Sequence, residues 1–236
     1  SVNNETKFNI SVISMSLGTR VLFSTYCDGD DPSAAAAVGA AIANNISVIA
    51  ATGNDGNITK IAWPACIKNV TSVGATYDTN VGSINYSSGC TDSTTFGDKI
   101  TCFSNRNSIT DLFAPGAIIT STKNGGGFED QTGTSMATPM VAAAFALIHQ
   151  YFKLTENKAV MPNETQRYLN NTGKLIVDTG GSNLQFSRIN IFAAIASLDT
   201  LSPNITITNP ENNSIKTNLS FIVNITSNEV LANATL

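Results

Sequence analysis

The chain has 236 residues, 42% of them hydrophobic, with a formal net charge of −4 and a pI near 4.9. This length predicts one or two domains with a sizeable core, and an acidic chain without a basic cluster argues against a nucleic-acid partner. No apolar run is long enough to span a bilayer, and the sequence carries no recognisable signal peptide. Because the chain starts at Ser1 rather than Met and ends inside the pattern VLANATL, we expect it to be an internal piece of a longer protein.

Strand and helix patterns alternate from residue 9 to residue 198. Residues 9–17 (NISVISMSL) are apolar and rich in β-branched side chains, which predicts a buried strand. Asp31 then suits a helix N-cap and Pro32 the first helical position, so we expect an alanine-rich helix up to Ala43. The same reasoning predicts strands at 46–53 and 69–76, short strands around the Pro-Gly turn of 111–122, and helices at 135–152, 164–171 and 190–198. This alternation is typical of an α/β fold with a parallel β-sheet and helices on both faces.

The pattern changes near Pro203. Residues 201–236 alternate polar and apolar side chains, with the apolar ones at Ile205, Ile207, Phe221, Val223 and Ile225. This alternation favours the opening strands of a β-sandwich, or Ig-like, module. Such a module needs ~100 residues, so the segment would be only its start. We therefore predict two domains, 1–200 and 201–236.

The four cysteines are Cys27, Cys66, Cys90 and Cys102, and none of them forms a CxxC pair. This spacing argues against a zinc or thioredoxin-type site. An even number of cysteines in a chain rich in Asn, Ser and Thr favours disulfides and an oxidising compartment, with four unrelated buried thiols as the alternative. Asn-x-Ser/Thr acceptors are also frequent, and many of them must arise by chance in a chain with so much asparagine; examples are Asn45, Asn57, Asn69, Asn204 and Asn224.

The stretch GTSMATPM at 133–140 runs from a loop into the predicted helix 135–152. Gly133 permits a tight turn, and Ser135 lies where the helix begins. A helix N-terminus points free N–H groups and partial positive charge at such a residue. Taken alone, GTS before a helix most often marks an ordinary Ser/Thr N-cap.

The segment GTSMATP resembles the nucleophile motif of the subtilisin-like serine proteases, the subtilases. Other stretches resemble that family in the same order and at compatible spacing: ISMSLG (13–18), VIAATGNDG (48–56), WPAC with NVTSVGAT (63–76), CFSNR with DLFAPGAIITST (102–122), and SRINIFAAI (187–195). The resemblance covers roughly residues 9–198. It implies a three-layer α/β/α subtilisin-like peptidase domain over 1–200 that is incomplete at its N-terminus.

The resemblance also implies roles for individual residues. Ser135 would be the nucleophile, and the side-chain amide of Asn54 would stabilise the oxyanion together with the Ser135 backbone N–H. Substrate binding would fall to Ser16, Leu17 and Gly18, which would pair with the substrate backbone, and to Ala51, Thr52, Gly53, Ala62 and Thr134, which would shape the site and its P1 pocket. Small residues on both sides suggest an open pocket for apolar or varied P1 groups. Pro64 matches a proline that is often cis in this family.

The sequence departs from the family pattern at a few positions. Met140 stands where the family usually has a histidine that is not the catalytic base, and Ser14 stands where an asparagine is usual. The loop 83–101 is longer than its family counterpart. We pair Cys90 with Cys102, which bracket this loop, and Cys27 with Cys66, whose segments flank the predicted specificity pocket.

The catalytic base is missing from the motifs. The only histidine, His149, lies 14 residues beyond Ser135, which on one helix is about 21 Å at ~1.5 Å per residue. Asp28, Asp55 and Asp111 match no family position for the triad aspartate. In subtilases the chain order is Asp, His, Ser, so both partners are expected upstream of Ser1. The fragment alone would then be inactive, and it would expose a surface that the missing N-terminal part of its domain covers.

These observations predict a secreted or cell-surface serine endopeptidase acting on polypeptides. It would need no cofactor for catalysis; subtilases often bind structural calcium, but no Asp/Glu cluster here is assigned to it. Two alternatives stay open. One is a catalytically dead subtilase-fold module that binds peptides or serves a structural role, and the other is a β-rich adhesion or wall protein with an incidental protease-like part.

Overall fold

The computed structural model describes residues 9–87, 89–199, 205–209 and 224–227. The chain divides into two compact units, Ser1–Ser197 and Leu198–Leu236. In the second unit, β13 (Ile205–Asn209) and β14 (Asn224–Ser227) form an antiparallel pair. Most of 201–236, including Phe221 and Val223, lies outside the described residues, so the β-sandwich module stays a prediction.

The first unit is organised around a six-stranded sheet in the order β1-β3-β5-β8-β12-β11. The first five of these strands run parallel to their neighbours, and only β11 is antiparallel to β12. The strands are β1 (Val12–Met15), β3 (Ser47–Ala51), β5 (Thr71–Thr76), β8 (Leu112–Pro115), β11 (Lys174–Val177) and β12 (Gln185–Arg188). The sequence therefore predicted β1, β3, β5 and β8; its segments matched the observed end at Thr76 and extended up to three residues beyond the other ends of β1, β3 and β5.

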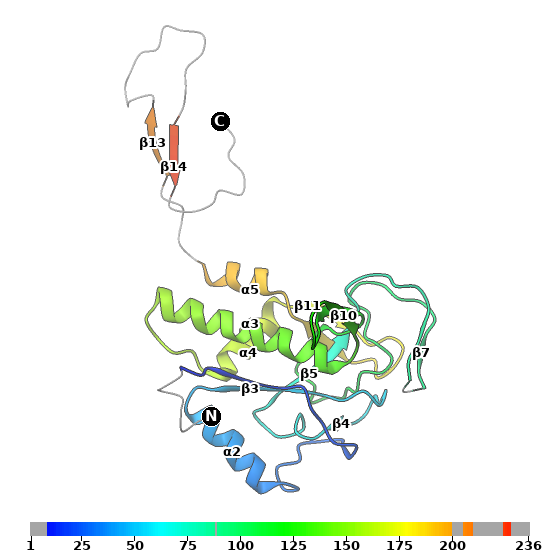
Figure 1. Cartoon of the computed structure of the whole chain (residues 1–236). Coiled ribbons are helices and arrows are strands. Elements are labelled where there is room, and N and C mark those ends of the chain that lie inside the picture. The colour runs from blue at the N-terminus through cyan, green and yellow to red at the C-terminus, as the bar shows by residue number, and fades with distance from the viewer. Residues whose placement is uncertain (1–8, 88, 200–204, 210–223, 228–236) are drawn as a thin grey trace. The chain divides into compact units, whose positions relative to one another are not determined.

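Helices cover both faces of this sheet, which confirms the predicted α/β fold class (Figure 1). The long helix α3 (Thr134–Thr155) packs across β1, β3, β5 and β8, with α4 (Pro162–Thr172) beside it. On the opposite face lies α2 (Pro32–Ala43), which starts where the sequence predicted because Asp31 Oδ1 accepts a hydrogen bond of 3.0 Å from Ala34 N. The last helix of the unit is α5 (Ile191–Leu198).

Short two-stranded ribbons lie outside the main sheet. They pair β2 (Leu22–Phe23) with β4 (Ile61–Ala62), β6 (Ile84–Asn85) with β7 (Thr91–Asp92), and β9 (Ile119–Thr122) with β10 (Phe128–Gln131). The sequence predicted neither β10 and β11 nor the other strands outside its four strand segments, which are β2, β4, β6, β7 and β12. All four residues of β10 are exposed, and only Ile176 of β11 is buried, so neither strand carries the apolar pattern of a core strand.

The core lies where β3 and β5 are buried on both faces, which is why both strands read as near-continuous runs of small and β-branched residues. Both predicted disulfides are confirmed: Cys27–Cys66 and Cys90–Cys102. No helix in the described part of the chain is long and apolar enough to cross a membrane.

Candidate active site

Ser16, Asn54 and Ser135 meet at one edge of the sheet. Ser16 directly follows β1 and Asn54 lies just beyond β3, while Ser135 is the second residue of α3. The Ser16 hydroxyl donates a 2.8 Å hydrogen bond to the Ser135 carbonyl, and the Ser135 hydroxyl lies 3.4 Å from the Ser16 carbonyl oxygen. The carboxyl ends of parallel strands are where ligands bind in α/β sheets, so this edge is the natural place for a site.

The Ser135 carbonyl is free to accept this bond because of Pro139. In a regular helix the N–H of residue 139 would donate to the carbonyl four residues earlier, at Ser135. Proline has no N–H, and Pro139 lies inside α3. The Ser16 hydroxyl takes the vacant acceptor and thereby ties the end of β1 to the first turn of α3.

Thr134 orients the side chain of Asn54. The Thr134 backbone N–H and hydroxyl donate hydrogen bonds of 2.9 and 3.0 Å to Asn54 Oδ1. The carbonyl end of the amide is thus committed to Thr134, and the Nδ2 end is left to point elsewhere. A side chain at Gly133 would crowd that end, because a Cβ there would lie 3.1 Å from Asn54 Nδ2.

The first turn of α3 adds a second group of donors. The Thr134 N–H donates to Asn54 Oδ1 and the Met136 N–H to the Gly133 carbonyl, whereas Gly133 at the N-cap has no side chain that could accept from the Ser135 N–H. The helix dipole adds partial positive charge there. Asn54 Nδ2 and the Ser135 N–H together are the kind of donor pair that stabilises an oxyanion in acyl transfer.

Asn105 holds the loop that carries Asn54. Its Oδ1 accepts from the backbone N–H groups of Asp55 and Asn57 at 3.0 and 2.9 Å, and its Nδ2 donates to Asp55 Oδ2 at 2.9 Å. Its own backbone N donates to the Gly53 carbonyl at 2.9 Å. Asn105 is fully buried. Asn105 lies in the CFSNR stretch, but no local pattern predicts its role, because its partners are 48 to 52 residues away in the sequence.

The neighbouring residue, Arg106, makes a buried ion pair with Asp178. Arg106 Nε and Nη2 donate to the two Asp178 oxygens, both at 2.8 Å, and both side chains are almost fully buried. Burial alone would raise the pKa of Asp178, but the Arg106 guanidinium and hydrogen bonds from Ser182 outweigh it and hold that pKa below its usual value. The pair ties the loop after Asn105 to the turn between β11 and β12.

The predicted specificity pocket has a wall of small residues. An added Cβ at Gly18 or at Gly53 would lie 3.2 Å from Ala62 Cβ, so Ala62 sits against both glycines. Ala51, Thr52, Ala62 and Thr134 are almost fully buried, whereas Ser16, Leu17 and Gly18 are exposed and Gly53 is half-buried. The exposed residues Ser16, Leu17 and Gly18 and the half-buried Gly53 can therefore contact a substrate directly. The buried residues can only shape the wall behind them. The predicted cis peptide at Trp63–Pro64 is confirmed.

His149 lies away from Ser135, as the sequence predicted. Its Nε2 is 3.2 Å from the hydroxyl of Ser47, the first residue of β3, whereas Ser135 lies near the carboxyl ends of the strands. Burial lowers the pKa of His149, which favours its neutral form. Asp111 accepts hydrogen bonds from Ser72 and Gln166, and Asp28 accepts one from Lys68 N. No base for Ser135 is found within the described residues.

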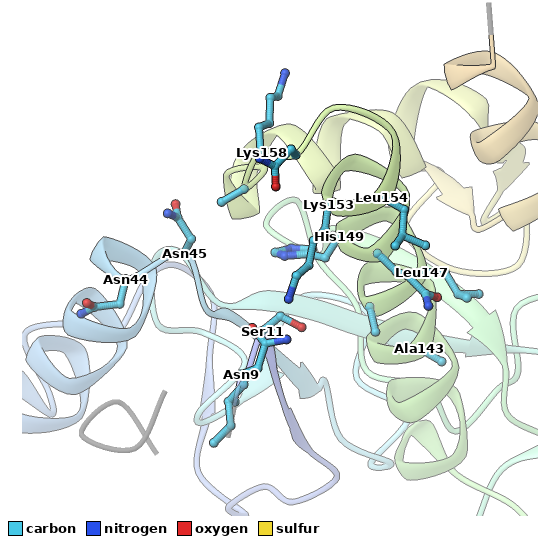
Figure 2. A pocket seen from close by; sticks show the side chains of 15 residues that line it. Asn9, Ser11, Asn44, Asn45, Ala143, Leu147, His149, Lys153, Leu154 and Lys158 are labelled. Carbon is cyan, nitrogen blue, oxygen red and sulfur yellow. The ribbon is translucent and has the colours of Figure 1, made fainter. Parts of the chain in front are cut away.

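A hollow of about 960 Å³ lies between the C-terminal half of α3 and the segments that lead into β1 and β3. In Figure 2, His149 and Lys153 of α3 extend toward Asn9 and Ser11 across this space. Apolar side chains of α3 line it too, among them Leu147, which is 48% exposed. The described part of the chain holds no cluster of three or more His, Cys, Asp or Glu side chains that could bind a metal ion.

Comparison with known proteins identifies the family of this chain. Residues 2–190 match the model of the subtilase family, peptidase S8. An intracellular serine protease of Paenibacillus polymyxa is 38% identical over 145 residues, which cover 60% of this chain and 36% of that protein. The alkaline serine exoprotease A of Vibrio alginolyticus is 33% identical over 175 residues, covering 73% of this chain and 27% of that protein.

Solved structures agree with the sequence comparison. The prenylagaramide maturation protease PagA superposes with a TM-score of 0.64 at 26% identity, covering 84% of this chain and 65% of that one. The patellamide maturation protease PatA gives 0.64 at 25% identity, covering 84% and 66%. The chain thus spans about a third of the length of the sequence relatives and about two thirds of the solved proteases. With the family model matched over most of its length, the chain belongs to the subtilase family.

Proposed function

We propose that the protein containing these residues is a serine endopeptidase with Ser135 as nucleophile. The observation that carries the proposal is the contact between Thr134 and Asn54. Because Asn54 Oδ1 accepts from Thr134, the Nδ2 end of the amide is available beside the first turn of α3. Ser135 Oγ would attack the carbonyl carbon of a peptide bond and pass its proton to a histidine base. The C–N bond then breaks, the amine leaves with that proton, and water hydrolyses the acyl-enzyme.

Asn54 Nδ2 and the Ser135 N–H would receive the charge that develops on the carbonyl oxygen. In subtilisin, removing the corresponding asparagine lowers kcat about 10²–10³-fold, and we expect Asn54→Ala to act in the same way. The exposed segment Ser16–Gly18 would pair with the substrate backbone as an added strand. The P1 side chain would then lie between Gly18 and Gly53, over Ala62.

The base and its orienting aspartate would come from residues outside this sequence. His149 cannot serve as that base, because its contact with Ser47 places it at the amino end of β3. β1 is the end strand of the sheet, so its free edge would give the remaining part of the domain a surface on which to pack. The hollow between α3 and the segments before β1 and β3 would give a second one (Figure 2). The 236-residue chain alone would accordingly be inactive.

The environment and partners follow from the same features. Two disulfides favour an oxidising compartment, so we propose a secreted or cell-surface enzyme, although some relatives are intracellular proteases by name. The substrate would be a polypeptide rather than a nucleic acid, and catalysis would need no cofactor. Structural calcium remains unassigned. Residues 201–236 would open an accessory β-sandwich module.

The experiment that tests this function is fluorophosphonate labelling of the full-length protein, with mass spectrometry locating the adduct. We expect the adduct on Ser135, loss of it in Ser135→Ala, and full labelling in His149→Gln. A folded full-length protein that takes no label would overturn the protease function. The alternative would then be a catalytically dead subtilase-fold module, and peptide binding by its segment Ser16–Gly18 would be measured next.

A further inference from the structure

Acceptor sequences for N-glycosylation are more frequent in this chain than its composition explains. The sequence holds 27 asparagines and 51 serines and threonines among 236 residues, so random placement gives about six Asn-x-Ser/Thr triplets. The chain has 13. The abundance of asparagine therefore accounts for only about half of them.

The acceptors of the first unit avoid its buried positions. Seven fall on described asparagines, all exposed or half-buried: Asn9, Asn45, Asn57, Asn69, Asn85, Asn163 and Asn170. By contrast, the buried asparagines Asn105 and Asn107 are not followed by Ser or Thr at the required position. The triplets thus occur where a glycan has access to the side chain.

Three of these acceptors line one hollow. Asn69 precedes β5, while Asn163 and Asn170 belong to α4, about 100 residues later, yet all three border the same space of about 400 Å³. Asn69 and Asn163 are exposed and Asn170 is half-buried. Turn geometry explains asparagine at Asn69, whose φ is 72°, but Asn163 and Asn170 are helical and need no such residue.

This hollow lies at the amino ends of the parallel strands, whereas Ser135 lies at their carboxyl ends. Asn69 stands just before β5 and Asp111 just before β8, so the hollow borders the amino ends of two parallel strands. The candidate active site lies at the carboxyl ends. The six residues of β5 separate the two edges by about 20 Å at ~3.3 Å per residue. Sugars at this hollow would leave the substrate groove open.

The lining of the hollow suits carbohydrate. Tyr26, which is 50% exposed, and Val70 border it with apolar surface. Lys68, Asn171 and Arg167 add amide and charged groups, while Gln166 and Asp111 bond each other at its wall. Flat aromatic surfaces pack against the apolar face of a sugar ring, and amide and charged groups bond its hydroxyls. A glycan attached at the rim has partners to fold back upon.

We propose that Asn69, Asn163 and Asn170 are N-glycosylated and that their first sugars cover this hollow. In the reaction, Asn Nδ2 forms a bond to the anomeric carbon of a lipid-phosphate-linked sugar, the amide loses one proton, and the lipid phosphate leaves. The proposal rests on the secretion proposed above, because acceptors are modified during export. It does not depend on catalysis by Ser135.

The test is glycopeptide mass spectrometry on the protein isolated from the cells that naturally make it. We expect peptides carrying Asn69, Asn163 and Asn170 to bear hexose- or hexosamine-containing masses on most molecules. Asn69→Gln, Asn163→Gln and Asn170→Gln should each remove one glycan. Asn171→Gln, which changes an asparagine of the same hollow outside any acceptor triplet, should remove none.

Unmodified Asn69, Asn163 and Asn170 in exported, disulfide-bonded protein would overturn the proposal, and so would glycans confined to Asn57 and Asn85. The glycan masses on the wild-type peptides alone decide between these outcomes, so the test does not depend on whether each variant folds. Fluorophosphonate labelling of Ser135 in the same sample reports separately on the protease function.

Discussion

Thr134 donates two hydrogen bonds to Asn54 Oδ1 and accepts a third, of 3.3 Å, from Gly53 N. Thr134 is fully buried and precedes Ser135, the proposed nucleophile; its hydrogen bonds fix both the loop that carries Asn54 and the direction of the Asn54 amide. We therefore propose that Thr134 positions Asn54, the proposed oxyanion donor.

We predict that Thr134→Val lowers kcat of the full-length enzyme about fivefold with little change in KM. Valine keeps the shape of threonine but loses the hydroxyl that bonds Asn54, and one hydrogen bond is worth about 1 kcal/mol, or roughly a factor of five in rate. Thr134→Ser keeps the hydroxyl and should stay near wild-type activity. Steady-state kinetics on a peptide substrate measure both. Equal losses in Val and Ser would show that packing, not orientation of Asn54, matters here.

Ala62 should control the size of the P1 group. Because Ala62 Cβ lies against Gly18 and Gly53, Ala62→Leu would fill the space between them. We expect kcat/KM for substrates with P1 Phe to fall at least fivefold relative to P1 Ala, since overpacking costs about 1–3 kcal/mol. Leu175→Ala, a change at a 61% exposed side chain of β11, is the control and should leave this ratio unchanged. An unchanged ratio in Ala62→Leu would place the pocket elsewhere.

The sequence predicted an element of the fold wherever the residues that determine it are adjacent in the chain. Asp31-Pro32 marked the start of α2 because a cap and the first helical residue are adjacent in sequence. The sequence predicted β3 because both faces of this strand are buried, which requires a continuous run of apolar and small residues. The polar strand β10 was not, because it is defined by pairing with β9 rather than by any apolar pattern.

The candidate site shows the same division. The GTSMATP stretch and Asn54 were found because they are contiguous motifs. The contribution of Asn105 was missed because its four hydrogen bonds reach a loop about 50 residues earlier. The role of Pro139 in freeing the Ser135 carbonyl for Ser16 also depends on a contact 119 residues apart. Sequence spacing alone gives no access to such contacts.

The Arg106–Asp178 pair should be costly to break and cheap to replace. Asp178→Asn removes the charge that Arg106 faces in a buried setting, and we expect a loss of about 3–5 kcal/mol of unfolding free energy. The double variant Arg106→Met, Asp178→Leu should recover most of that loss. Chemical denaturation of the full-length protein measures both. A double variant as unstable as Asp178→Asn would contradict a cost arising from an unpaired buried charge.

The same pair predicts a pH dependence. The pKa of Asp178 is lower in the folded protein than the ~3.9 of an unfolded chain. Its stabilising contribution is therefore fully present above about pH 4 and is lost as the pH falls through the folded pKa. We expect Asp178→Asn to flatten this acid-side loss in a series of denaturation curves from pH 6 to pH 2. A slope unchanged from wild type would mean that other carboxylates account for it.

The two disulfides should differ in their contribution. Cys27–Cys66 closes a loop with a sequence separation of 39, whereas the separation for Cys90–Cys102 is 12. Chain-entropy arguments give about 4 kcal/mol for the first and about 3 kcal/mol for the second. We expect Cys27→Ser, Cys66→Ser to lower Tm more than Cys90→Ser, Cys102→Ser. The first bridge also lies close to the β2–β4 ribbon that holds Ala62, so its loss should reduce P1 selectivity as well as Tm. Differential scanning calorimetry and the P1 Phe to Ala ratio test both effects, and a reversed order of Tm would point to strain or local packing instead of loop length.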